Sequence, residues 1–224
     1  MAAAVLLLPA VVAAAETDSD PHAIVREVVT DALEQLSNNR EAIKQDPGLA
    51  RALIERKAMP HTDMELMARF VLGRYWRDAT PEQRQRFTRA FHAHIVQTYS
   101  HALSEYADRI VDFAREARID YRTLRNDNGR ALVRAAISTP EIDTVNIDLR
   151  MHRQDGVWKV FDVQVAGVSI LLSYRANIAG ELASEGLDGL IARLEKRTGI
   201  SDGSRSAPDS HAPQDRDSRT ALAQ

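Results

Sequence analysis

The stretch from Asp155 to Arg175 constrains the fold of this 224-residue chain more than any other, because it joins the last strand of a sheet to a helix. Asp155-Gly156 predicts a turn, since Gly accepts a positive φ and Asp can hydrogen-bond to its own backbone. The nine residues that follow are rich in β-branched and aromatic side chains and are apolar on both faces, which is typical of an inner strand. Gly167 then predicts a bend, and 169–183 predicts a helix that returns across the sheet.

Three further strands precede this one. Alternation of apolar and polar side chains predicts strands over 117–123, 131–137 and 145–151, and Asn126-Asp127-Asn128-Gly129 predicts the turn between the first two. Each strand has one apolar face, so we expect a four-stranded antiparallel meander. In the last strand, simple alternation assigns one face to Val157, Phe161, Val163 and Val165, and the other to Trp158 and Val160.

The first half of the chain carries helix signals instead. Asp20-Pro21 and Asp46-Pro47 each place an N-cap residue before a proline at the first helical position. Thr62 with Glu65, and Thr80 with Gln83, both fit the capping box. The helix that begins after Thr80 continues to about residue 106, roughly 38 Å at 1.5 Å per residue, which is long enough to cross a whole sheet. Helices followed by a meander predict the α+β class.

The two ends of the chain differ from its middle. Residues 1–15 are apolar, uncharged and end in Ala13-Ala14-Ala15, so we expect a signal peptide and an exported protein. They are too short to span a bilayer as a helix, and no other segment is apolar enough to do so. Residues 200–224 are rich in Ser, Asp, Arg and Pro and predict a disordered tail. The folded domain is therefore expected over 16–199.

Several classes of chemistry lack their residues. A net charge of −3 argues against a nucleic-acid binder, and the absence of Cys excludes thiol chemistry. Neither a P-loop nor a Gly-x-Ser-x-Gly elbow is present. His92, His94 and His101 lie on the long helix, but no carboxylate is in register to complete a metal site. We expect no metal and no cofactor.

Three ordered blocks of the sequence resemble the MlaC family, also called the toluene-tolerance auxiliary family. The first block is Met59-Pro60-His61-Thr62-Asp63, followed by Val71-Leu72-Gly73-Arg74-Tyr75-Trp76-Arg77 and Thr80-Pro81-Glu82-Gln83-Arg84. The second is Trp158-Lys159-Val160-Phe161-Asp162-Val163 with Gly167-Val168-Ser169 and Tyr174-Arg175, and the third is Gly186-Leu187-Asp188-Gly189-Leu190-Ile191. The chain departs from the family pattern at Ala166, Ser173 and Ile178, where the family has Glu, Asn and an aromatic residue.

The resemblance implies a periplasmic phospholipid carrier that is not an enzyme. It implies a curved sheet and helices that enclose an apolar cavity, similar to the nuclear-transport-factor-2-like (NTF2-like) fold. It also implies two partners: an outer-membrane lipoprotein complex, and an inner-membrane ABC transporter with an MCE-domain subunit. We assign the wall that contacts the acyl chains to apolar residues on the predicted stripes: Val71, Phe87, Phe91, Ile95, Tyr99, Val133, Ile137, Ile147, Leu149, Val163 and Val165.

Two other functions remain open from the residues themselves. Asp162 lies between Phe161 and Val163, and an aspartate in an apolar site is the general base of ketosteroid-isomerase-like enzymes of the NTF2-like fold. The protein could then be a small-molecule enzyme. Alternatively, a filled core would make it a structural or adaptor protein. Asp162 could equally be a structural residue that is hydrogen-bonded by backbone amides or by Arg175.

Overall fold

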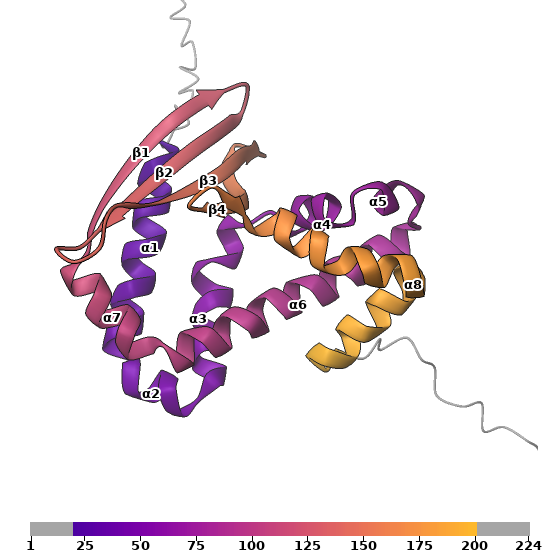
Figure 1. Ribbon diagram of the computed structural model, residues 1–224, viewed down its shortest axis with the longest axis horizontal. Helices are drawn as coiled ribbons and strands as arrows, with labels where there is room; N and C mark the ends of the chain where they lie inside the picture. Colours follow the sequence, from indigo (N-terminus) through magenta and orange to yellow (C-terminus); the bar gives the residue numbers. More distant parts are fainter. Residues whose placement is uncertain (1–19, 201–224) are drawn as a thin grey trace, which may run out of the picture.

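The computed structural model describes residues 20–200. The helical half comes first and the sheet second, as Figure 1 shows. The helices of the first half are α1 (Pro21–Asn38), α2 (Arg40–Gln45), α3 (Pro47–Lys57), the 3-10 turn η1 (Met59–His61), α4 (Met64–Leu72), α5 (Arg74–Asp78), α6 (Pro81–Glu105) and α7 (Ala107–Glu116). The remaining elements are β1 (Arg118–Asp127), β2 (Arg130–Ser138), β3 (Val145–Gln154), β4 (Val157–Val165), β5 (Val168–Ser169) and α8 (Ile170–Thr198).

The sheet is an antiparallel meander in the order β1-β2-β3-β4-β5. The predicted α+β class and the four long strands are confirmed, and β5 adds a fifth strand of two residues. Asn128-Gly129 and Asp155-Gly156 both have positive φ at each position, as a two-residue hairpin turn requires. Ala166, with φ of 49°, precedes Gly167 in a third turn of the same kind.

β4 lies between β3 and β5 in the sheet order, as its predicted inner position requires. Because β5 is short and pairs only with Gln164 and Val165, most of this edge of β4 has no strand partner. The free edge is instead covered by the segment around η1, where Thr62 forms a parallel bridge with Val160 and the Asp63 amide donates to the Val160 carbonyl at 2.9 Å.

A β-bulge at Phe161 changes which side chains of β4 face the interior. Val163 pairs with Leu149 and Val160 pairs with Met151, so Phe161 is the extra residue between them. Val160 and Val163 therefore lie on the same face, and Phe161 points to the opposite one. The simple alternation used above was wrong here, because an inserted residue reverses the order of faces.

The helix starts follow the sequence signals closely. Asp20 and Asp46 cap α1 and α3, and Thr80 and Gln83 form the predicted capping box of α6. At α4 the N-cap is Asp63, whose carboxylate accepts from the Leu66 amide at 2.8 Å. The N-cap of α4 therefore lies one residue after Thr62, and the capping box expected from Thr62 and Glu65 is not formed.

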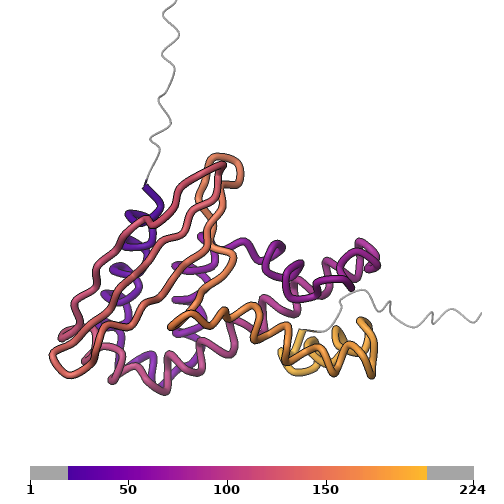
Figure 2. The backbone as a smooth tube through the Cα atoms, turned by 45° about the horizontal axis from the view of Figure 1, so that its top comes forward, coloured from indigo at the N-terminus to yellow at the C-terminus, as the bar shows by residue number. Residues whose placement is uncertain are grey.

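The sheet and α1 lie at one end of the molecule, whereas α4, α5 and α8 lie at the other (Figures 1 and 2). The long helix α6 connects the two ends and packs against both α3 and α8. The helix α8 was expected to return across the sheet, but it extends away from it beside α4 and α6. The reason is its apolar side chains, which join those of α4 and α6 in one buried cluster that includes Leu171, Leu182, Leu190, Ile191 and Leu194.

Within residues 20–200, no helix combines the length and the hydrophobicity needed to span a bilayer. The predicted signal peptide lies outside the described residues, and so does the predicted tail except for Ile200.

Candidate functional site

A cavity of 680 Å³ lies where α1, α3 and α6 face β4. This volume is within the range of about 300–1,000 Å³ that is common for ligand pockets. The wall is almost entirely apolar, and most of its side chains are aliphatic. It is lined by Val29, Ala32, Leu33 and Leu36 of α1; Leu53, Ile54, Lys57, Ala58, Met59 and Thr62 of α3 and the residues after it; Met64 and Met67 of α4; Ile95, Tyr99, Ala102, Leu103, Tyr106 and Ile110 of α6 and α7; and Val160, Asp162, Val163, Ile170 and Leu171.

Three of the eleven residues that the sequence assigned to the wall line this cavity: Ile95, Tyr99 and Val163. Ile95 and Tyr99 are one turn apart on α6, and Val163 faces them from β4. The apolar stripe of α6 and the last long strand thus both contribute to this cavity, and the contact of these residues with acyl chains stays a prediction.

Three other predicted wall residues lie in the packed cluster between α4, α6 and α8. Val71 and Phe87 are 1% and 0% exposed, and Phe91 is 2% exposed. The rings of Phe87 and Phe91 stack at 5.6 Å. Their neighbours are protein side chains, because the first half of α6 faces α8 whereas its second half faces the cavity.

Five predicted residues of the sheet also lie outside the cavity lining. Val133 and Leu149 pair with each other across β2 and β3. Both pack in a hydrophobic cluster to which α1 contributes Val25. The other three residues are Ile137, Ile147 and Val165, which lie toward the ends of β2, β3 and β4. Ile147 pairs there with Val165. Val165 is 42% exposed and Ile137 and Ile147 are half-buried. The helix α1 covers β1 and β2, so only β4 reaches the cavity.

The contribution of α1 and α3 to the wall was not predicted. Leu33, Leu53 and Ile54 lie on the apolar sides of these helices and line the cavity together with Val29, but none of them was assigned to the wall. An apolar stripe has the same pattern whether it contacts a neighbouring helix or an open space. The sequence therefore showed which side of each helix is buried. It did not show that the space between these helices is hollow.

Asp162 lies in the cavity wall, and its carboxylate is 2% exposed and hydrogen-bonded on both oxygens. The hydroxyl of Ser169 is 2.9 Å from each oxygen, and the Leu171 amide donates to Oδ1 at 3.3 Å. Arg150 Nη1 is 3.8 Å from Oδ2. Asp162 therefore ties β4 to the N-terminus of α8, where the helix dipole favours a negative charge. The guanidinium that faces it is Arg150 and not Arg175.

Two parts of the cavity wall reach solvent. Tyr99 and Tyr106 are 41% and 42% exposed, and burial of the phenol raises the pKa of Tyr99. On the side of α1 and α3, Lys57 forms an ion pair with Asp31 at 2.5 Å. The cavity thus has an aromatic rim and a charged rim.

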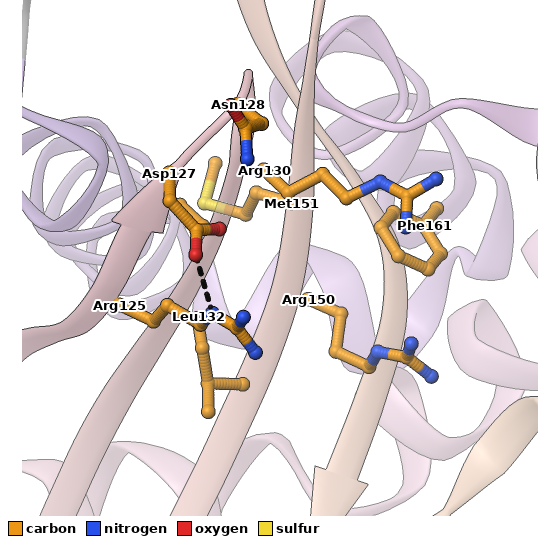
Figure 3. Close-up of a pocket in the computed structure, with 9 residues that line it drawn as sticks. Arg125, Asp127, Asn128, Arg130, Leu132, Arg150, Met151 and Phe161 are labelled. Atoms are coloured by element: carbon orange, nitrogen blue, oxygen red, sulfur yellow. Dashed lines mark hydrogen bonds and ion pairs between the residues drawn. The ribbon is translucent and has the colours of Figure 1, made fainter.

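A second pocket, of 500 Å³, lies on the opposite face of the sheet (Figure 3). Leu132 and Arg150 pair across β2 and β3 on this outer face, and Arg130 and Phe161 also border the pocket. Arg150 lies 5.1 Å from the centre of the Phe161 ring. Its lining is cationic, so this outer pocket offers no enclosed apolar space for a hydrocarbon chain.

The histidines singled out on α6 have separate surroundings. His92 lies 3.2 Å from Glu55, His101 lies 3.6 Å from Glu105, and His94 contacts the Tyr174 ring edge-on. Among residues 20–200, no group of three or more His, Asp or Glu side chains is arranged to hold a metal ion.

Known proteins provide relatives for most of the chain. It is 27% identical over 179 residues to the intermembrane phospholipid transport system binding protein MlaC of Haemophilus influenzae, covering 80% of this chain and 82% of that protein. It is 29% identical to the toluene tolerance protein ttg2D of Pseudomonas putida, with 80% of each chain covered.

A solved structure has the same fold. The phospholipid-binding protein from Ralstonia solanacearum, determined in complex with a phospholipid, superposes with a TM-score of 0.66 at 23% identity, covering 81% of this chain and 98% of that one. The family model for the MlaC protein matches residues 26–196, which include every residue that lines the cavity. This chain belongs to the MlaC family.

Proposed function

We propose that this protein binds a phospholipid, encloses its acyl chains in the 680 Å³ cavity and leaves the headgroup in water. The observation that carries the proposal is the aliphatic lining of that cavity, which contains few groups that could recognise a polar ligand. The fold neighbour from Ralstonia solanacearum was solved with a phospholipid, and the relatives from Haemophilus and Pseudomonas are named for lipid transport and toluene tolerance.

The energetics of lipid transfer explain why such a cavity is useful. Moving one methylene group into water costs about 0.8 kcal/mol, so a diacyl lipid with some thirty methylenes would face on the order of 20 kcal/mol in free solution. Aliphatic side chains remove most of this cost while they leave the chains free to move. A wall of Val, Leu, Ile and Met suits flexible chains better than a flat ligand.

We further propose that transfer takes place in the periplasm, between an outer-membrane lipoprotein complex and an inner-membrane ABC transporter with an MCE-domain subunit. The signal-peptide pattern of residues 1–15 and the family membership support this route. The sequence contains no P-loop, so the direction of transfer would come from these partners. Docking that separates β4 from α6 would release the lipid.

An enzymatic role for Asp162 has less support. A general base needs an oxygen that can accept a proton from a substrate. Both carboxylate oxygens of Asp162 instead accept from Ser169, and Oδ1 also accepts from the Leu171 amide. We therefore propose a structural role for Asp162.

Native mass spectrometry of the purified protein tests the lipid-binding proposal. The wild-type protein should carry diacyl phospholipid, and Ala102→Trp, which fills the cavity from α6, should carry less than about a tenth of that amount. Ala183→Trp places the same side chain on an exposed position of α8 and serves as the control. A full lipid load in Ala102→Trp, or none in the wild type, would contradict the proposal.

A further inference from the structure

Lys57 is the only basic residue among the 23 described residues that line the cavity. Asp162, the only acidic one, is 2% exposed and already hydrogen-bonded within the protein. The charge available to a ligand in this cavity is therefore the ammonium of Lys57.

Lys57 contacts both the cavity and the solvent. It is the last residue of α3, and its side chain is 32% exposed. A lysine in such a place can lay its methylene groups against apolar surface while the ammonium stays in water. A lipid whose acyl chains filled the cavity could place its phosphate at this rim, within reach of the ammonium.

The present partner of Lys57 can be exchanged. Asp31 of α1 holds the ammonium at 2.5 Å, but its own side chain is 41% exposed. Ion pairs with this much contact with water contribute little to stability, because water competes for both charges. A lysine ammonium has three N–H donors, so a phosphate can join or replace the carboxylate.

On the other rim, the described cavity lining contributes only the neutral hydroxyl groups of Tyr99 and Tyr106. Arg109 lies 5.8 Å from the centre of the Tyr106 ring, but it is not among the residues that line the cavity. A phosphodiester carries a full negative charge, and a charge-assisted hydrogen bond to an ammonium is about twice as strong as a neutral one.

We propose that the Lys57 ammonium binds the phosphate of the carried lipid, in competition with Asp31, at the rim between α1 and α3. This inference rests on the proposed function. It predicts that the protein distinguishes a phospholipid from a lipid with the same chains and no phosphate. It also predicts that removing the charge of Lys57 weakens the preference for the phospholipid, whereas removing the charge of Asp31 strengthens it.

The experiment compares phosphatidylglycerol with diacylglycerol of identical acyl chains, each used to displace a fluorescent phospholipid from the full chain. The measured quantity is the affinity for phosphatidylglycerol divided by the affinity for diacylglycerol. Lys57→Met keeps the length of the side chain and removes the charge. It should lower this ratio about tenfold, because only the binding of phosphatidylglycerol becomes weaker. Asp31→Asn should raise the ratio about threefold. Lys57→Arg should retain the wild-type ratio, and Lys44→Met, which removes an exposed lysine paired with Asp108, should also leave it unchanged.

The outcomes separate this inference from the proposed function. If the wild-type protein binds neither lipid, the proposed function fails. If it binds both and Lys57→Met leaves the ratio unchanged, or if Asp31→Asn lowers the ratio, the phosphate lies elsewhere and the inference is overturned. Added salt supplies a second readout, because it should reduce the ratio of the wild type but not that of Lys57→Met.

Discussion

Ser169 Oγ lies 2.9 Å from both carboxylate oxygens of Asp162, and the same Oγ accepts a hydrogen bond from the Leu172 amide at 3.1 Å. One hydroxyl thus caps α8 and partners a buried carboxylate on β4. Both residues belong to the segment in which the sheet passes into the helix, beside the cavity. The connection fixes the angle at which α8 leaves the sheet.

Replacement of Asp162 should therefore destabilise the protein. Asp162→Asn removes the charge that the α8 N-terminus and the Ser169 hydroxyl stabilise, and should lower the free energy of unfolding by about 2 kcal/mol. Urea denaturation measures the effect. Asp112→Asn, at an exposed carboxylate with 63% side-chain exposure, should change it by less than about 0.5 kcal/mol. Equal stabilities of the two variants would contradict the structural role of Asp162.

Asp63 joins the start of α4 to the sheet through two separate interactions. Its Oδ1 accepts from the Leu66 amide, and its Oδ2 lies 2.7 Å from Nε2 of His152 on β3. Asp63→Ala removes both and should cost about 2 kcal/mol of unfolding free energy, whereas Asp63→Asn keeps the N-cap and should cost about half as much. Chemical denaturation of both variants checks the order. An Asn variant as unstable as the Ala variant would show that the cap contributes little.

The stability of the protein should depend on pH through His94. Burial, followed by the nearby Arg197, lowers the pKa of His94 below its ordinary value of 6.5, so the unfolded state takes up a proton before the folded state does. Stability should therefore fall as the pH drops from 6.5 toward the lower pKa of the folded state. His94→Gln should reduce this fall, measured as the midpoint of thermal unfolding at several pH values. His101→Gln, with a side chain 80% exposed, is the control. If the midpoint of thermal unfolding depended on pH as steeply in His94→Gln as in the wild type, the assignment to His94 would be refuted. Burial also lowers the pKa of His61, so a weaker pH dependence should remain in His94→Gln.

Ala166 occupies a turn position that favours glycine. Its φ is 49°, in the left-handed region where a Cβ atom costs about 1 kcal/mol. Ala166→Gly should raise the free energy of unfolding by about 0.5–1 kcal/mol. The same change at Ala183, on the exposed face of α8, should lower it by about 1 kcal/mol, because glycine weakens a helix. Two changes of the same sign would contradict this account.

Local signals in the sequence were enough to locate most of the fold. The capping box of Thr80 and Gln83 placed the start of α6, and Asn128-Gly129 and Asp155-Gly156 placed two of the hairpins. Each signal acts within a few residues of the chain. The short helices α2 and α5, of six and five residues, escaped notice because they are too short to show a period of their own.

Features that depend on distant contacts were harder to predict. The bulge at Phe161 exists because β3 and β4 pair in one register, and it exchanged the faces assigned to Phe161 and Val160. Whether an apolar residue lines a cavity depends on what faces it. Phe87 and Ile95 of α6 belong to the same buried cluster, but only Ile95 also borders the cavity. Of the residues assigned to the wall, Ile95, Tyr99 and Val163 line the cavity where α6 faces β4, and their contact with a lipid stays a prediction.

Photo-crosslinking from inside the cavity would locate the acyl chains of the bound lipid. A benzophenone amino acid at Leu103, in the cavity wall, or at Leu132, on the outer face of the sheet, is irradiated in the protein purified with its bound lipid. The account predicts a covalent adduct with the mass of a phospholipid, joined through an acyl chain, at position 103 and none at position 132. An adduct at position 132 but not at 103, or co-purified lipid that crosslinks at neither position, would contradict it.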